Sequence, residues 1–194
     1  MGRAPGQRAG LTHAAVLAAA QELLAESGLD ALTMRALARR LQVTPNALYS
    51  HTSSKTQLLD DLLDEALASV ESPRTDAEDP IAALAGLMTS TYTVLTAHPD
   101  LVPLYLARQG ARGPNAIRLG EVMDGLLARA GVIGAPADEA RRALIVHTIG
   151  FAAFATGSPL TPESDRPLPP QALHANFSRS LRWLLAGIVA PAAD

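Results

Sequence analysis

The sequence predicts an all-α protein of about nine helices, and three observations support that prediction. Every apolar pattern in the 194 residues repeats with the period of a helix, and no alternating strand pattern competes with it. Hydrophobic residues make up 48% of the chain, which is enough to build a core. A capping residue or a proline also precedes most of the helical segments. We therefore expect helices that pack through apolar stripes.

Four helices are expected in the first part of the chain, each with its own start signal. Gly28 is a stop signal for the first helix. Pro45 stands at the first position of a short third helix, directly after a threonine cap. The fourth helix carries a wide apolar stripe from Leu58 to Val70. The four expected capping residues are Thr12, Thr33, Thr44 and Ser54.

Five more helices are expected after a change of composition. Residues 71–79 are polar and contain a proline, which is typical of a hinge between two units. His98 and Pro99 interrupt the first of these helices, and a proline-rich loop from Pro159 to Pro170 precedes the last. The expected helices cover 80–96, a short segment ending at 108, 116–131, 137–156 and 171–190.

Charge is distributed unevenly along the chain. The net charge is −3, but residues 1–55 hold six basic and three acidic side chains, a net +3. Residues 56–194 hold 10 basic and 16 acidic side chains, a net −6. This division indicates that only the N-terminal part binds a polyanion, although a chance fluctuation gives the same count.

Composition also restricts the compartment. Cysteine is absent, which excludes disulfides and cysteine-based zinc sites and fits a reducing compartment. The apolar run 14–20 is short for a signal peptide and continues as an amphipathic helix pattern. The run 143–155 is too short to span a bilayer. We therefore expect a soluble, cytoplasmic protein with no membrane partner.

The second and third helices are joined by residues 41–44, which is the spacing of a helix-turn-helix. In that motif the second helix enters the DNA major groove. The apolar residues that would hold the two helices together are Leu37, Leu41, Val43 and Leu48. The polar side, suited to base edges and phosphates, consists of Thr44, Pro45, Asn46, Tyr49 and Ser50. An ordinary helix-loop-helix in a bundle core is the alternative.

Lys55 is expected in the first turn of the fourth helix. A cation is mildly unfavourable there because the helix macrodipole is positive at its N-terminus. Free backbone N–H groups at the same place make an anion site. A DNA phosphate between Lys55 and the helix end would explain this position, whereas a lysine that extends into solvent is the alternative.

Residues 32–63, LTMRALARRLQVTPNALYSHTSSKTQLLDDLL, resemble the DNA-binding segment of tetracycline-repressor-like (TetR family) transcription regulators. The family pattern has a glycine-valine turn, a short recognition helix ending in leucine-tyrosine-x-histidine, and a lysine four residues after that histidine. The N-terminal helix, the helical second part and the total length also agree. The matching residues are Leu32, Thr33, Leu37, Ala38, Val43, Leu48, Tyr49, His51 and Lys55.

This resemblance implies a set of DNA-binding residues with separate roles. Thr33, Tyr49 and Lys55 would hold phosphates, and Arg35 can join them. Residues 44–46 would face bases. The full set is Thr33, Arg35, Thr44, Pro45, Asn46, Tyr49, His51 and Lys55.

Some positions of the segment are open to two interpretations or depart from the family. His51 is either a DNA contact or a capping or packing residue, and Arg3 or Arg8 can reach the minor groove. Gln42 replaces the usual glycine, so it must adopt a positive φ, at roughly 1 kcal/mol or more, or the turn must bend differently. Thr52 replaces a common aromatic residue, which removes a core plug.

The second part of the chain resembles the family in architecture alone. Members act as dimers through their last two long helices and respond to small-molecule effectors, so the resemblance implies both properties here. The apolar stripes on helices 137–156 and 171–190 suit such a dimer, although they also suit an intramolecular core. Mostly apolar walls would favour an apolar or amphipathic effector. The cavity candidates, each also typical of plain core, are Met88, Tyr92, Tyr105, Met123, Leu127, His147 and Phe151.

Sequence patterns of enzymes are missing from the chain. There is no phosphate-binding glycine loop, no His-Glu-x-x-His and no nucleophile elbow. The acidic run of Asp60, Asp61, Asp64 and Glu65 favours a solvated helix face over a divalent-metal site. We therefore expect no catalytic residue, no metal and no cofactor.

These observations combine into one expectation of function. Residues 1–55 form a helix-turn-helix DNA-binding domain, residues 56–72 a connecting helix, and residues 73–194 an effector-binding and dimerisation domain. The dimer is expected to repress transcription by binding palindromic double-stranded operator DNA until an effector releases it. The alternative is a helical-bundle small-molecule-binding protein or enzyme that does not bind DNA.

Overall fold

The computed structural model describes residues 11–108, 110–157 and 169–190. Within them every regular element is helical, which confirms the all-α class: nine α-helices and one short 3₁₀ helix. The chain divides into two compact units, Met1–Leu62 and Leu63–Asp194. The proline-rich loop expected before the last helix lies almost entirely outside the described residues.

The first unit contains α1 (His13–Ala31), α2 (Met34–Arg40), α3 (Pro45–Leu48) and the beginning of α4 (Lys55–Leu67). The expected capping residues are confirmed. The Thr12 hydroxyl accepts a hydrogen bond from the Ala15 amide at 3.1 Å, and three more caps follow the same pattern. These pairs are Thr33 with the Ala36 amide, Thr44 with the Ala47 amide and Ser54 with the Gln57 amide.

Gly28 interrupts the first helix at a kink, as the expected stop signal predicts, and a second short helical segment follows within α1. The Gly28 φ of 75° and ψ of 178° are non-helical, and a further turn continues to Ala31. Only glycine adopts this conformation without steric cost, which explains the residue. The turn after the bend leads to Leu32, which is fully buried. The other residues of this core with at most 1% exposure are Val16, Ala20, Leu24, Leu37, Leu48, Leu58 and Leu62.

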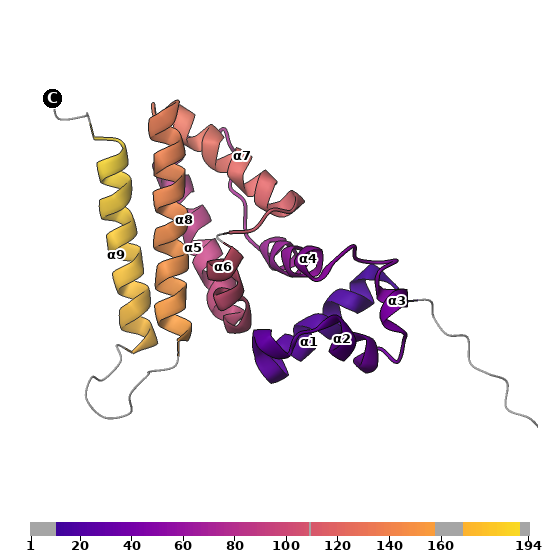
Figure 1. The fold of residues 1–194 in the computed structure, drawn as a ribbon. Helices are drawn as coiled ribbons and strands as arrows, with labels where there is room; N and C mark the ends of the chain where they lie inside the picture. The colour runs from indigo at the N-terminus through magenta and orange to yellow at the C-terminus, as the bar shows by residue number, and fades with distance from the viewer. Residues whose placement is uncertain (1–10, 109, 158–168, 191–194) are drawn as a thin grey trace, which may run out of the picture. The chain divides into compact units, whose positions relative to one another are not determined.

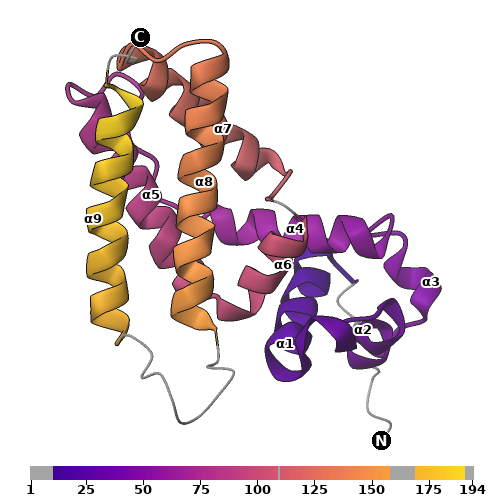
Figure 2. The ribbon, with the colours of Figure 1, turned by 60° about the vertical axis from the view of Figure 1, so that its left-hand side comes forward.

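The second unit is a helical bundle around α5 (Pro80–Ala97), which packs against α7 (Pro114–Arg129), α8 (Ala135–Thr156) and α9 (Pro170–Ile188). A 3₁₀ turn, η1 (Pro99–Leu101), and α6 (Val102–Arg108) follow α5. Figures 1 and 2 show α8 and α9 side by side and antiparallel. α5 has the length and composition of a membrane span, but its packing against three helices is that of a core helix.

Candidate nucleic-acid interface and ligand cavity

The turn between α2 and α3 has the geometry of a helix-turn-helix. The Val43 amide bonds the Ala38 carbonyl at 3.0 Å and closes the end of α2. Leu37 and Leu48 are fully buried between the helices, while Leu41 and Val43 are half-buried. The expected apolar contact between α2 and α3 is therefore present.

Gln42 takes the left-handed conformation that the sequence offered as one of two outcomes. Its φ is 55°, the one positive φ at a non-glycine position among the described residues. Its amide bonds the Arg39 carbonyl at 3.2 Å, and its side chain is exposed. The turn thus keeps the path of a glycine turn and stores the steric cost of a side chain at this position.

A polar face of α3 is open to solvent. Thr44, Pro45, Asn46, Tyr49 and Ser50 are all exposed, and Tyr49 keeps 51% of its surface. The Thr44 and Ser50 hydroxyls already serve local bonds, since Ser50 donates to the Ala47 carbonyl at 2.7 Å. Within the described chain, neither the side-chain amide of Asn46 nor the hydroxyl of Tyr49 makes a hydrogen bond.

Residues 51–55 form a fixed connection from α3 to α4. The His51 and Thr52 amides both bond the Leu48 carbonyl, at 2.8 and 3.0 Å, and Lys55 is half-buried in the first turn of α4. Thr52 occupies the position where the family commonly has an aromatic residue. It is 3% exposed, and its hydroxyl donates to the Ser54 carbonyl at 3.1 Å, which fixes the loop by a hydrogen bond instead.

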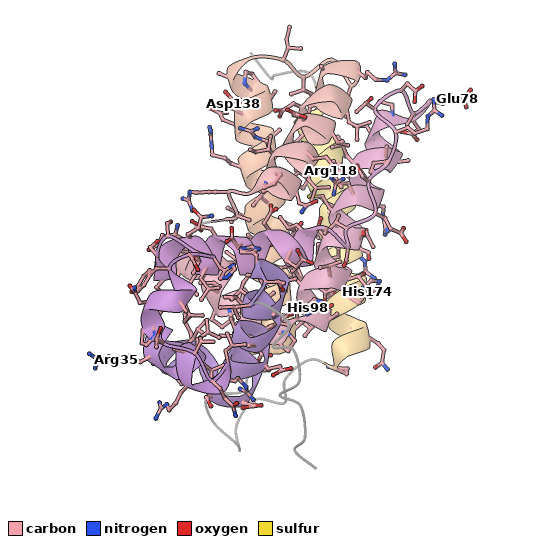
Figure 3. All side chains as sticks on the ribbon, turned by 90° about the vertical axis from the view of Figure 1, so that its right-hand side faces the viewer. Arg35, Glu78, His98, Arg118, Asp138 and His174 are labelled. Carbon is pink, nitrogen blue, oxygen red and sulfur yellow. The ribbon has the colours of Figure 1, made fainter. Side chains whose placement is uncertain are left out.

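The three arginines of α2 have different environments. Arg35, an expected phosphate contact, is exposed and projects outward from the surface in Figure 3. Arg39 is exposed as well. Arg40 instead bonds Glu26 of α1 through both Nη atoms and lies 3.5 Å from Glu22. Thr33, also expected at DNA, is exposed and caps α2, whereas Arg3 and Arg8 lie outside the described residues.

The contact between Arg40 and Glu26 shifts the pKa values of these two groups. The hydrogen bond from Arg40 to Glu26 holds the pKa of that carboxyl below its usual range. On solvent-exposed side chains such a pair adds little stability, but it links α2 to α1. Sequence spacing could not reveal it because the partners lie on different helices. A second cross-helix contact of this kind joins His13 Nε2 to Asp61 Oδ2 at 3.0 Å.

The acidic run of α4 is not the solvated face that was expected. Asp64 is buried, at 6% exposure, and Asp61 also accepts a bond from Gln57 at 2.7 Å. In the described part of the chain, no cluster of three or more potential ligands could hold a metal ion.

The second unit contains a cavity of about 210 Å³. Three expected residues, Met88, Tyr105 and Met123, lie on its wall. No lining side chain that the structure describes is charged, and the hydroxyls of Thr91 and Thr148 donate to backbone carbonyls of their own helices. Among the described residues, the lining consists of Leu67, Leu87, Met88, Thr91, Leu95, Tyr105, Gly110, Ala111, Ala116, Leu119, Gly120, Met123, Ile145, Thr148 and Ile149.

Four other cavity candidates lie elsewhere. Leu127 is plain core, at 0% exposure. Tyr92 stacks on Phe177 of α9 with ring centroids 4.3 Å apart. Phe151 joins the same cluster through His147, whose ring lies 4.8 Å from it. Helical periodicity could not separate these positions from the cavity wall, because residues one turn apart on one helix contact different partners.

An apolar surface runs along α8 and α9. Val146, Phe154 and Trp183 are 69%, 80% and 68% exposed, which is unusual for such large apolar side chains. A surface groove beside them is lined by Val146, His147, Gly150, Phe151, Phe154, Leu173 and Asn176. Both helices therefore present large apolar side chains to solvent as well as to the core; of Val146, Phe154 and Trp183, only Phe154 belongs to the stripes expected from the sequence.

Comparison with known proteins places this geometry in a family. Residues 16–62 match the model of "Bacterial regulatory proteins, tetR family". An HTH-type transcriptional regulator of Saccharopolyspora erythraea is 35% identical over 72% of this chain, although the match spans only 59% of that protein.

Two solved structures extend the likeness to nearly the whole chain. A variant of TetR from Acinetobacter baumannii AYE in complex with minocycline is 31% identical to this chain. The match covers 91% of this chain and 96% of the TetR variant, with a TM-score of 0.75. BioQ with its natural double-stranded DNA operator is 27% identical. That match covers 93% of this chain and 99% of BioQ, with a TM-score of 0.74. The chain therefore belongs to the TetR family of transcriptional regulators.

Proposed function

We propose that this chain is a dimeric repressor that binds a palindromic DNA operator and is released by an uncharged, apolar small molecule. The observation that carries the proposal is the exposed polar face of α3, followed by Lys55 in the first turn of α4. This arrangement supports base contacts from one element and phosphate contacts from the next. BioQ, a relative of similar fold, was solved on its own operator.

Roles follow from the polar atoms that remain available. The Asn46 amide can bond adenine in the major groove, and Thr44 and Pro45 lie beside it on α3. Thr33, Arg35, Tyr49 and Lys55 supply phosphate contacts. His51 is half-buried, which supports packing more than base contact. Residues 1–55 serve as the DNA-binding domain, α4 as the connection and residues 73–194 as the effector and dimer domain.

The dimer is assigned to α8 and α9. Their exposed Val146, Phe154 and Trp183 would lie buried between two copies. Two recognition helices would then enter successive major grooves about 34 Å apart. Repression of this kind takes place on chromosomal DNA, so we place the protein in the cytoplasm.

The effector is assigned to the 210 Å³ cavity of the second unit. A charged ligand would lose its hydration there without gaining a partner, because none of the described lining residues carries a charge. The relative from Acinetobacter baumannii AYE holds minocycline, which supports a ligand-binding role for this domain. An effector that favours a DNA-incompatible state would release the operator.

The proposal is tested by fluorescence anisotropy with DNA from upstream of the protein's own gene. We expect a specific complex that weakens steeply with salt. Tyr49→Phe and Lys55→Ala should weaken binding to all sequences alike, whereas Asn46→Ala should cost about 1 to 3 kcal/mol and relax base preference. Ser69→Ala, at an exposed site beyond α4, is the control.

Two results would contradict the assignment. Absence of a salt-sensitive specific complex with any neighbouring intergenic DNA would favour the helical-bundle alternative without DNA binding. Identical effects of Asn46→Ala and Lys55→Ala on base preference would show that the division into base and phosphate contacts is wrong.

A further inference from the structure

Asp64 is a buried carboxylate held by the N-terminus of another helix. Its Oδ1 accepts from the Ala116 amide at 2.9 Å, and its Oδ2 accepts from the Asn115 amide at 3.1 Å and from Asn115 Nδ2 at 3.0 Å. Asp64 thereby caps α7 from α4, because Gly113, the residue at the N-cap position, has no side chain for this purpose. The positive end of the α7 macrodipole favours the negative charge.

Gly113 is required by the close approach of Asp64. Its φ of −91° and ψ of −177° are accessible to any residue, so backbone conformation does not demand glycine. A Cβ atom at this position would lie 2.1 Å from Asp64 Cγ. Any side chain at position 113 would therefore force the carboxylate away from the α7 N-terminus.

The turn of α4 that contains Asp64 also accepts a hydrogen bond from Tyr105 of α6, which lines the cavity. The Tyr105 hydroxyl of α6 donates to the Leu63 carbonyl at 3.0 Å. Burial and the neighbouring Asp64 raise the pKa of Tyr105, so the hydroxyl stays a donor. Tyr105 and Ala116 both line the cavity. The C-terminal half of α4 thus follows α6 and α7, and the helix is continuous back to Lys55.

We propose that Asp64 is a positioning residue that transmits occupation of the cavity to α4 and so to the DNA-contacting end of that helix. This inference rests on the proposed function. A ligand larger than the 210 Å³ cavity must displace its walls, and Ala116 in the first turn of α7 is one of them. Because the Asp64 bonds join that turn to α4, a displaced α7 moves α4 with it.

The first test needs no DNA. Hydrogen exchange is measured with and without the neutral apolar fluorophore N-phenylnaphthylamine for the full chain and for Asp64→Asn and Gly113→Ala. In the unaltered protein, the fluorophore should change exchange in the first turn of α4 on the order of fivefold. In both variants this change should disappear, while the fluorophore still becomes fluorescent in the cavity.

Matched controls separate the Asp64 contact from general destabilisation. Glu65→Gln removes an exposed carboxylate from the next position of α4, and Gly86→Ala adds a Cβ where nothing lies within 4 Å. Both controls should respond as the unaltered protein does. Circular dichroism checks folding, and if one variant unfolds, the other keeps the test decisive.

The second test uses operator DNA and separates this inference from the proposed function. Saturating fluorophore should raise the DNA dissociation constant about tenfold in the unaltered protein and less than about twofold in Asp64→Asn. Equal responses in folded variants and unaltered protein, or no fluorophore effect on α4 in the unaltered protein, would overturn the role of Asp64. Failure of the unaltered protein to bind DNA would instead overturn the proposed function.

Discussion

At the scale of single residues, Gln42 is the position where local strain and function meet. A side chain at φ 55° is disfavoured relative to glycine, yet the Gln42 side chain is exposed and makes no hydrogen bond to another described residue that would offset the cost. Strain of this kind, in a turn that orients a recognition helix, persists because the surrounding bonds determine the backbone path. The Val43 amide and the Thr44 cap supply those bonds.

Gln42→Gly is therefore expected to stabilise the first unit. Glycine removes the steric cost but loses more backbone entropy on folding, so the net gain in the free energy of unfolding should be about 0.5 to 1 kcal/mol. Urea denaturation measures it. Gln21→Gly in the regular part of α1 should instead lose about 1 kcal/mol. A loss at both positions would mean that the turn at Gln42 is unstrained.

Residue-scale features were predictable where their causes are local. The threonine caps and the Gln42 conformation depend on the few residues around them: the sequence predicted the caps and offered the Gln42 conformation as one of two outcomes. The Arg40–Glu26 pair was not predictable, because α1 and α2 meet through a bend at Gly28 whose angle no local pattern specifies. The hydrogen bond from the Thr52 hydroxyl was not predicted either, although its acceptor, the Ser54 carbonyl, lies only two residues away.

At the scale of elements, the contact between α8 and α9 contains a histidine with one defined tautomer. Ser180 Oγ donates to the Asn176 carbonyl, so it must accept from His147 Nε2, 2.8 Å away. The Nδ1 atom is then an unprotonated, buried nitrogen without a hydrogen-bond partner. Protonation would place a charged N–H there with no acceptor.

Stability should consequently fall in mild acid. Burial lowers the pKa of His147 in the folded chain, whereas the unfolded chain titrates near 6.5. Full stability is present above that unfolded-state pKa and is lost as pH falls from it through the lower folded-state pKa. Thermal unfolding of the protein and of His147→Gln between about pH 7.5 and about pH 5 checks this. The variant should lose less melting temperature over the interval, and an equal loss would assign the acid sensitivity to other groups.

Element types and approximate bounds were predictable from periodicity and caps, because each helix has its own apolar stripe. The residues that each helix face contacts were harder to predict from the sequence. Asp64 was assigned to a solvated face because its neighbours Asp60, Asp61 and Glu65 are also acidic. The burial of Asp64 depends on the approach of α7. Asn115 of α7, which donates a hydrogen bond to Asp64, lies 51 residues further along the chain. For a similar reason the sequence could not separate the cavity candidates that line the cavity from those that lie in the core, because this depends on which helix each residue contacts.

At the scale of the whole molecule, the exposed apolar surface of α8 and α9 sets the expected assembly. Phe154→Asp should raise the dimer dissociation constant roughly 30-fold or more, which corresponds to the about 2 kcal/mol of an interface hot spot. Light scattering after size exclusion measures it. Emission from Trp183, the only tryptophan in the chain, should shift to longer wavelength as the dimer separates.

Ile133→Asp is the matched control for this prediction. Ile133 is 69% exposed but lies in the turn before α8, away from the proposed interface residues. It should leave the dimer intact. A monomeric unaltered protein, or equal dissociation by both variants, would contradict an interface on α8 and α9.

The contact between Asp64 and Gly113 also restricts how the sequence can change over time. With Asp64 in its present place there is no room for a Cβ atom at position 113, and a side chain at 113 would leave α7 without its cap from α4. A single change therefore has a cost in either order, since loss of Asp64 first leaves the α7 N-terminus without its cap, and a side chain at 113 first displaces a buried charge from its partners. Among relatives, the two positions should vary as a pair, with an aspartate at one accompanied by a glycine at the other.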